Sequence, residues 1–105
     1  MDTLEYFVHG IAERGSEHCL VSGRIQSGTL RAGQVFNQIE TVCNIDPKIF
    51  TFDRVERKQV SLRIKRTEWV VKIDVYTAGD TPGLELVGEG LDALKPRTIL
   101  TLRND

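Results

Sequence analysis

The fold is decided by residues 21–36, which read VSGRIQSGTLRAGQVF. Two extended pieces flank a centre that is interrupted by glycines. Because side chains alternate between the two faces of a strand, the incoming piece, residues 18–26, carries small and apolar side chains on one face. That face consists of Cys19, Val21, Gly23 and Ile25. We therefore predict a strand over 18–26, in which Cys19 acts as a small buried hydrophobic residue.

The glycines of this stretch predict turns. Ser27-Gly28 signals a turn because glycine adopts a positive φ without steric cost, and Gly33 signals another before a new strand begins at Val35. The glycine spacing matches neither GxGxxG nor GxxxxGK[ST], the patterns that hold phosphates. The stretch therefore indicates a small β-barrel and gives no sign of a nucleotide site.

Short alternating segments recur along the chain. We predict further strands at residues 4–11, 35–42, 60–65, 69–76, 84–87 and 98–102, and one helical turn at 90–95. In the segment 35–42, alternation places Val35, Asn37 and Ile39 on one face. Seven or eight short strands without a long amphipathic helix favour an all-β fold, either a closed barrel or a sandwich.

The connections between these strands differ in clarity. Residues 66–68 are predicted to form a short hairpin loop, and residues 78–83 form a dense turn signal. Pro47 interrupts any strand ladder because it has no N–H to donate. Residues 49–52 fit either a short strand or an apolar loop plug, and residues 44–59 as a whole receive no firm assignment.

Length and composition limit the function classes. A chain of 105 residues is expected to form one domain, spanning 1–105. Its net charge of −1 gives no general attraction to nucleic acid or to an anionic membrane. No apolar run approaches the ~20 residues that span a bilayer, and the N-terminus lacks the apolar core of a secretory signal. We therefore expect a cytoplasmic protein.

The sequence offers little that would carry out a reaction. His9 and His18 are expected to be exposed to solvent, and His18 and Cys19 point to opposite faces because they are neighbours on a strand. The two cysteines fit no zinc spacing, and a disulfide between them is disfavoured in the cytosol. Carboxylate pairs such as Asp80 with Glu85 fall in segments that read as turn-rich and solvated. We expect a protein that is not an enzyme and that holds no metal and no cofactor.

Positive charge gathers in residues 54–72, where seven basic and two acidic residues give a net charge of +5. If Leu62 and its apolar neighbours on the predicted strand 60–65 point inward, Arg63 and Lys65 point outward together, and Lys72 lies near them across the predicted hairpin. Such a face is suited to a phosphate backbone. The other interpretation is a solvated surface whose charges discourage pairing between strand edges. Trp69 belongs by alternation with the core.

Two segments resemble the second domain of elongation factor Tu. Residues 21–34 are similar to the VTGRVxxGxxxxGx segment of that domain, and residues 78–88, AGDTPGLELVG, are similar to its AG[DE]NVGxxLRG segment. The order is the same and the separation comparable, and FVHGI at 7–11 extends the similarity over most of the chain. The resemblance implies a closed antiparallel β-barrel of six to eight strands, the type that follows the GTPase domain in translation GTPases.

The resemblance also implies a role. In that family the barrel contacts aminoacyl-tRNA, the small ribosomal subunit or neighbouring domains, so this chain would be a non-catalytic binding module. Its partner would be RNA, the ribosome or a protein such as a GTPase domain. The candidate nucleic-acid-binding residues are Arg63, Lys65, Arg66, Lys72 and Arg24, with Arg31 as a further candidate. The alternative is a protein-interaction or structural barrel with no nucleic-acid role.

Two absences narrow the expected role. The chain contains no GxxxxGK[ST] and no NKxD motif, so it is not expected to hydrolyse GTP. Thr81, Pro82 and Val87 stand where the family has Asn, Val and Arg. The resemblance therefore does not extend to the polar groups that receive the tRNA acceptor end.

Overall fold

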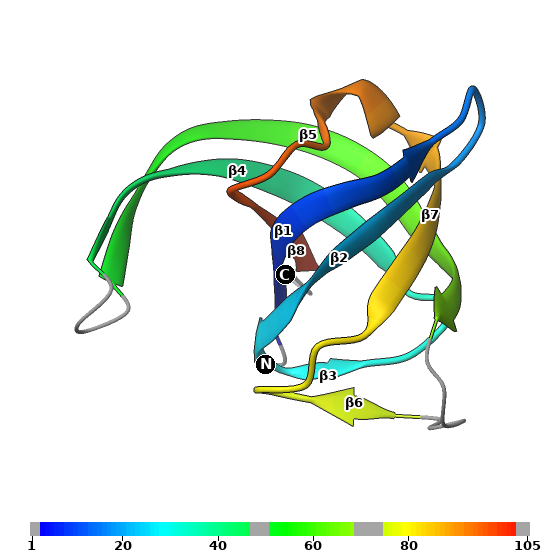
Figure 1. The fold of residues 1–105 in the computed structure, drawn as a ribbon, viewed down its shortest axis with the longest axis horizontal. Coiled ribbons are helices and arrows are strands. Elements are labelled where there is room, and N and C mark those ends of the chain that lie inside the picture. The colour runs from blue at the N-terminus through cyan, green and yellow to red at the C-terminus, as the bar shows by residue number, and fades with distance from the viewer. Residues whose placement is uncertain (1–2, 47–50, 69–74, 103–105) are drawn as a thin grey trace.

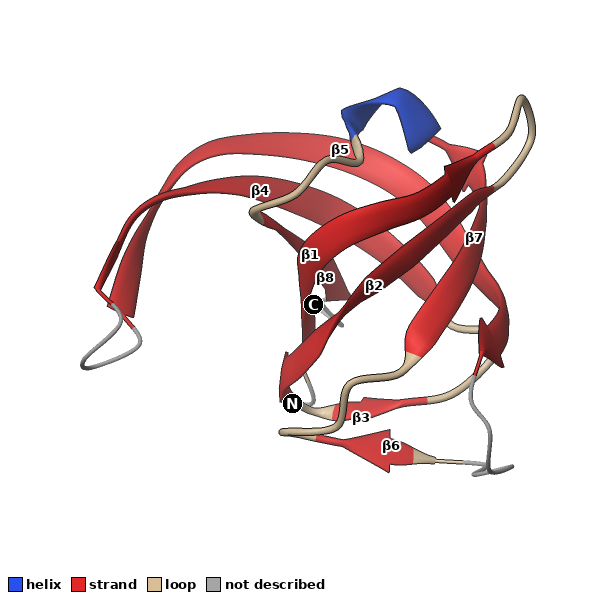
Figure 2. Ribbon diagram, in the orientation of Figure 1, coloured by secondary structure: helices blue, strands red, loops and turns tan. Residues whose placement is uncertain are grey.

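Six strands close into an antiparallel barrel, and two short strands form a separate pair at one end of it (Figure 1). The computed structural model describes residues 3–46, 51–68 and 75–102. Figure 2 shows that almost all of the regular structure is strand. The elements are β1 (Leu4–Arg14), β2 (Cys19–Ser27), β3 (Thr29–Leu30), β4 (Val35–Asp46), β5 (Thr51–Glu68), β6 (Tyr76–Thr77), β7 (Gly83–Glu89), the 3-10 helix η1 (Leu91–Ala93) and β8 (Thr98–Leu102). The closed all-β barrel predicted from the sequence is confirmed.

The barrel closes through its last strand. The order around the ring is β1-β2-β7-β5-β4-β8, and β8 is antiparallel to both of its neighbours. Leu4 of β1 lies opposite Leu102, and Gln38 of β4 lies opposite Thr101. Closure of this kind removes the exposed edges that an open sheet would present.

The barrel interior is filled by the alternating apolar side chains. On β2, the predicted face of Cys19, Val21 and Ile25 is buried, with exposed fractions of 0%, 2% and 0%. The other strands add further fully or almost fully buried side chains: Tyr6, Val8, Phe36, Leu62, Ile64, Leu84, Leu86 and Leu100. Tyr6 satisfies its hydroxyl inside the core by donating to the Pro82 carbonyl at 2.6 Å.

Glycine is required at two positions of the stretch 21–36 for different structural reasons. A Cβ on Gly23 would lie 2.0 Å from the carbonyl oxygen of Phe7 and 2.8 Å from the Tyr6 ring, so β1 and β2 approach closely only because that atom is missing. Gly28 has a φ of 84° and makes the predicted turn after β2. The first glycine serves packing and the second serves backbone geometry.

β4 departs from simple alternation. Val35, Asn37 and Ile39 were expected on one face, but Phe36 is fully buried, Ile39 is 4% exposed and Val35 is 39% exposed. The pairing of β4 with β5 shifts register between Phe36 and Gln38. This irregularity lets Phe36 and Ile39, three residues apart, both face the core.

β5 is much longer than the predicted strand 60–65. It runs without interruption from Thr51 to Glu68, so the predicted hairpin loop at 66–68 is wrong. Arg66 and Glu68 pair instead with Glu85 and Gly83 of β7. Of the predicted strand 69–76, residues 69–74 lie outside the described residues, and Tyr76 belongs to β6, which pairs with β3.

β4 and β5 also continue as a curved two-stranded ribbon beyond the barrel (Figure 1). The last β4–β8 pair is Thr41 with Thr98, yet β4 and β5 stay paired as far as Asp46 and Thr51. Pro47, where the sequence predicted an interruption of the ladder, lies outside the described residues. Of the segment 49–52, which the sequence left open between strand and plug, Thr51 and Phe52 are strand, and residues 49 and 50 lie outside the described residues.

Candidate nucleic-acid interface on β5

The outer face of β5 carries three of the predicted contact residues. Leu62 and Ile64 are fully buried, and the alternating residues Arg63 and Lys65 are exposed, as alternation predicts. Arg66 is also exposed, because the β5–β7 register shifts between Ile64 and Arg66. The structure therefore brings Arg63, Lys65 and Arg66 together on one strand, whereas Lys72 lies outside the described residues.

A carboxylate on the neighbouring strand changes the charge of this face. Glu85 of β7 is only 7% exposed. Its Oε2 lies 3.7 Å from Nζ of Lys65, and its Oε1 accepts a hydrogen bond from Nε of Arg66. The predicted strand 84–87 contains Glu85 as expected, but the expectation that its carboxylate lies in a solvated segment is wrong. One buried anion thus engages two of the three cations.

The pKa of Glu85 reflects this arrangement. Burial by itself would raise the pKa of the carboxyl, but the hydrogen bond from Arg66 and the charges of Arg66, Lys65 and His18 outweigh it and hold the pKa below its ordinary value of 4.5. Glu85 is therefore ionised at neutral pH, and it offsets part of the positive charge that a phosphate would meet.

Arg63 has different surroundings. It lies opposite Val35 on β4 and opposite Val87 on β7, and no ion pair of Arg63 is found among the described residues. Val35 is 39% exposed. An arginine flanked by apolar side chains keeps its guanidinium available while its stem packs on them. Of the three cations on this face, Arg63 is therefore the one best placed to bind an external anion.

The remaining candidates lie elsewhere. Arg24 is half-buried on β2, opposite Phe7 of β1, whereas the pairing of β2 with β7 covers only residues 19–21. Leu20 is the residue of β2 that faces Glu85, so Arg24 lies about 13 Å further along that strand. Arg31 is exposed in the turn before β4. Arg24 is therefore not part of the β5 face.

The groups that would support catalysis or metal binding are dispersed. His9 is exposed, its ring makes a T-shaped contact with the ring of Phe7, and Nε2 of His18 lies 3.6 Å from Oε2 of Glu13. Burial raises the pKa of the Cys19 thiol, an effect that the charge of Arg14 partly opposes. No group of three or more metal-ligating side chains is found in the described part of the chain. Across the same residues, no helix has the length and apolar character to cross a membrane.

The signal that sequence reasoning missed is Glu85. It alternates with Leu84 and Leu86, which are both core residues, so its outward position was open to inference. Its pairing with Lys65 and Arg66 could not be inferred, because no local pattern in the sequence shows that β7 lies beside β5.

The arrangement of six antiparallel strands closed by β8 defines the chain as a closed antiparallel β-barrel. It is similar to part of the crystal structure of translation elongation factor SelB from Methanococcus maripaludis, solved with the GTP analogue GppNHp. The TM-score is 0.67 at 14% sequence identity, over 98% of this chain and 19% of that chain. This similarity confirms the fold that the resemblance to the second domain of elongation factor Tu implied.

The comparisons of sequence alone find no relative. No family model matches the chain, and no curated protein matches it. The chain spans about a fifth of the length of the SelB chain, so the similarity concerns one barrel of a larger protein.

Proposed function

We propose that the chain is a non-catalytic binding module that contacts RNA phosphates through the outer face of β5, with Arg63 as its central residue. The observation that carries the proposal is the exposure of Arg63 between Val35 and Val87 without a carboxylate partner among the described residues. The translation-factor fold supports an RNA setting, although fold alone does not transfer function.

The geometry favours phosphate contact over base reading. Arginine binds phosphate through a planar fork of donors, and positive charge along a strand can follow a backbone without reading sequence. Lys65 and Arg66 contribute less than their number suggests, because Glu85 already engages both. We therefore expect weak binding that depends strongly on salt.

A salt titration with a structured RNA tests the proposal. The log-log slope of affinity against salt should fall by about 0.7–0.9 for each phosphate that the protein no longer neutralises. The variant Arg63→Glu/Lys65→Glu should bind more weakly and with a reduced slope. Arg97→Glu is the matched control, because Arg97 is exposed and its N–H bonds to Val8 of β1, three strands from β5 around the ring. Unchanged affinity and slope in the double variant overturn the proposal.

A second variant moves in the opposite direction. Glu85→Gln removes the anion that engages Lys65 and Arg66, so it should tighten RNA binding and increase the slope. Turnover by the purified protein that disappears in a His9→Ala/His18→Ala variant would contradict the non-catalytic part of the proposal.

A protein-interaction barrel without a nucleic-acid role is the second candidate. It is favoured by the ion pairs that Lys65 and Arg66 already form with Glu85 within the fold and by the exposed apolar side chain of Val35 beside Arg63. Arginine and apolar residues together are typical of protein interfaces. Absence of RNA binding even at low salt would favour this candidate.

A further inference from the structure

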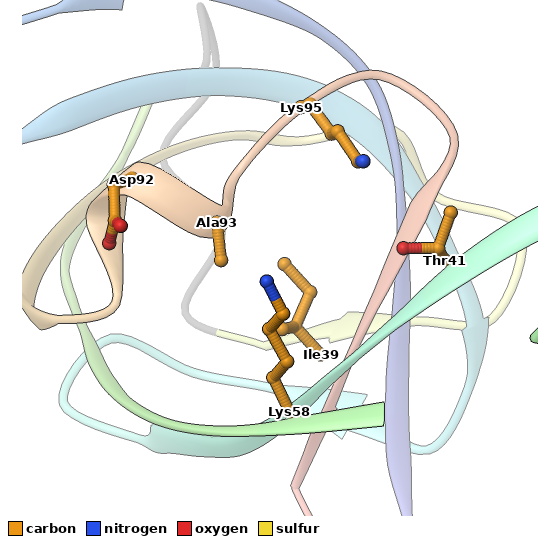
Figure 3. Close-up of a pocket in the computed structure, with 6 residues that line it drawn as sticks. All are labelled: Ile39, Thr41, Lys58, Asp92, Ala93 and Lys95. Carbon is orange, nitrogen blue, oxygen red and sulfur yellow. The ribbon is translucent and has the colours of Figure 1, made fainter. Parts of the chain in front are cut away.

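A small pocket with two lysines lies at the end of the barrel that η1 covers (Figure 3). Its volume is about 90 Å³. It is formed by β4, β5 and the segment between β7 and β8, and its lining residues are Ile39, Thr41, Lys58, Asp92, Ala93 and Lys95. Lys58 lies opposite Ile39 in the β4–β5 ladder, so the pocket lies at the open end of the barrel, next to the buried side chain of Ile39.

The polar groups of the pocket converge. Figure 3 shows the ammonium groups of Lys58 and Lys95 and the hydroxyl of Thr41 directed toward the same space, while the carboxylate of Asp92 points away from it. Among the described residues, neither lysine forms an ion pair. Two like charges beside one cavity repel each other, and a bound anion would relieve this repulsion.

The walls of the pocket are held in place. Arg14 of β1 donates from Nη1 to the Leu91 carbonyl at 2.8 Å and from Nη2 to the Leu94 carbonyl. Thr98 donates from its hydroxyl to the Lys95 carbonyl at 2.8 Å. The segment that presents Lys95 is therefore tied to β1 and β8, and less ordering is needed when a ligand binds.

We propose that this pocket binds one phosphate group, held by the ammonium groups of Lys58 and Lys95 and by the hydroxyl of Thr41. A phosphate monoester carries a charge of about −1.5 to −2 at neutral pH, which balances two ammonium groups. The pocket volume of about 90 Å³ leaves room for one tetrahedral oxyanion. The apolar floor of Ile39 and Ala93 strengthens the electrostatic attraction.

This site is independent of the RNA-binding face proposed above. Lys58 precedes Arg63 on β5 and belongs to the end of the barrel that carries η1, whereas Arg63 lies between Val35 and Val87 on the outer face. Inorganic phosphate and the terminal phosphate of an RNA 5′ end present the same chemistry to the pocket, and the experiments below distinguish them.

Titration with inorganic phosphate at constant ionic strength, followed by the amide NMR signals of Thr41 and Ala93, tests the proposal. Saturable shifts are expected, and Lys58→Gln or Lys95→Gln should each weaken binding about tenfold. Lys65→Gln is the matched control: it is an exposed lysine on the same strand as Lys58, but it faces Glu85. Shifts that do not saturate, or that weaken equally in Lys65→Gln, overturn the proposal.

A gain of affinity provides a second readout. Asp92→Asn removes the acidic side chain found among the described residues that line the pocket, and it should tighten phosphate binding about twofold to threefold. Weaker binding in Asp92→Asn would contradict the proposal, because it would mean that the ligand needs the carboxylate.

The two sources of phosphate are distinguished by short RNAs with and without a 5′ phosphate. If the phosphorylated RNA competes with inorganic phosphate and the unphosphorylated RNA does not, the ligand of the pocket is the RNA terminus. If neither RNA competes, the ligand is the free ion. The variant Arg63→Glu/Lys65→Glu should leave the phosphate titration unchanged. Failure of the RNA proposal and failure of this one therefore give different results.

Discussion

The inner and outer faces of β5 are built from alternate residues of one strand, yet they depend on different neighbours. Leu62 and Ile64 need only an apolar interior, and any of the surrounding strands supplies it. On the outer face, Lys65 contacts a carboxylate from β7, while Arg63 lies between valines of β4 and β7. A core residue can be recognised within its own strand, whereas the role of a surface charge is decided by the adjacent strand.

The largest expected effect is a loss of stability when a side chain on the inner face of the barrel is removed, here on β4. Phe36→Ala removes a fully buried aromatic side chain and should lower the free energy of unfolding by about 3–5 kcal/mol. Val35→Ala changes the neighbouring, 39% exposed residue and should cost less than about 1 kcal/mol. Urea unfolding of both variants measures the difference. Equal losses would mean that the two side chains do not occupy opposite faces of β4.

An intermediate effect is expected at Gly23, where β1 and β2 lie close together. Gly23→Ala places a Cβ 2.0 Å from the Phe7 carbonyl oxygen, so β1 and β2 must move apart, and the loss of stability should be about 1–3 kcal/mol. Gly10→Ala on β1 is the matched control, because its Cβ would meet only the Ser22 hydroxyl at 3.6 Å. Thermal unfolding of the two proteins compares them. A Gly23→Ala variant as stable as Gly10→Ala would place β1 and β2 further apart than described.

The smallest effect concerns the outer face and depends on pH. Because the pKa of Glu85 is lower in the folded protein than its ordinary value of 4.5, its ion pairs stabilise the fold above that value, and the contribution disappears as pH falls through the folded pKa. Glu85→Gln should therefore be less stable than the wild type at neutral pH, and the difference should vanish in acid.

Urea midpoints at pH values well above and well below 4.5 measure this difference. Glu89→Gln is the control, since Glu89 is an exposed carboxylate on the same strand. A stability difference that persists unchanged in acid would show that Glu85 acts through packing and not through its charge.

The sequence predicted most of the barrel and less of the candidate site. Alternation located the buried face of β2, and the bounds of β8 match the predicted segment 98–102. It failed at residues 66–68, because this polar segment resembles a loop on its own but is held in β5 by the pairing of Arg66 with Glu85. It also failed at Val35 and Phe36, since a register shift is a property of two strands and leaves no pattern in one.

The site depends on contacts between distant segments. Lys58 and Lys95 come from different parts of the chain and meet only because the segment after β7 folds over the mouth of the barrel. Glu85 meets Lys65 because β7 lies beside β5, and no local pattern gives that order. Both features require the ring order, which the sequence implied only through its resemblance to a known barrel.

The position of β8 has a consequence for how the protein is made. β1 leaves the ribosome before every other strand of the ring, but its partner Thr98–Leu102 follows only after all of them. Until then one side of β1 and one side of β4 lack their neighbour, and such unpaired strand edges promote aggregation of partly folded chains. Contacts between such distant residues also form slowly. The nascent chain is therefore most vulnerable in the interval before β8 emerges, and a pause in synthesis just upstream of Thr98 would prolong it.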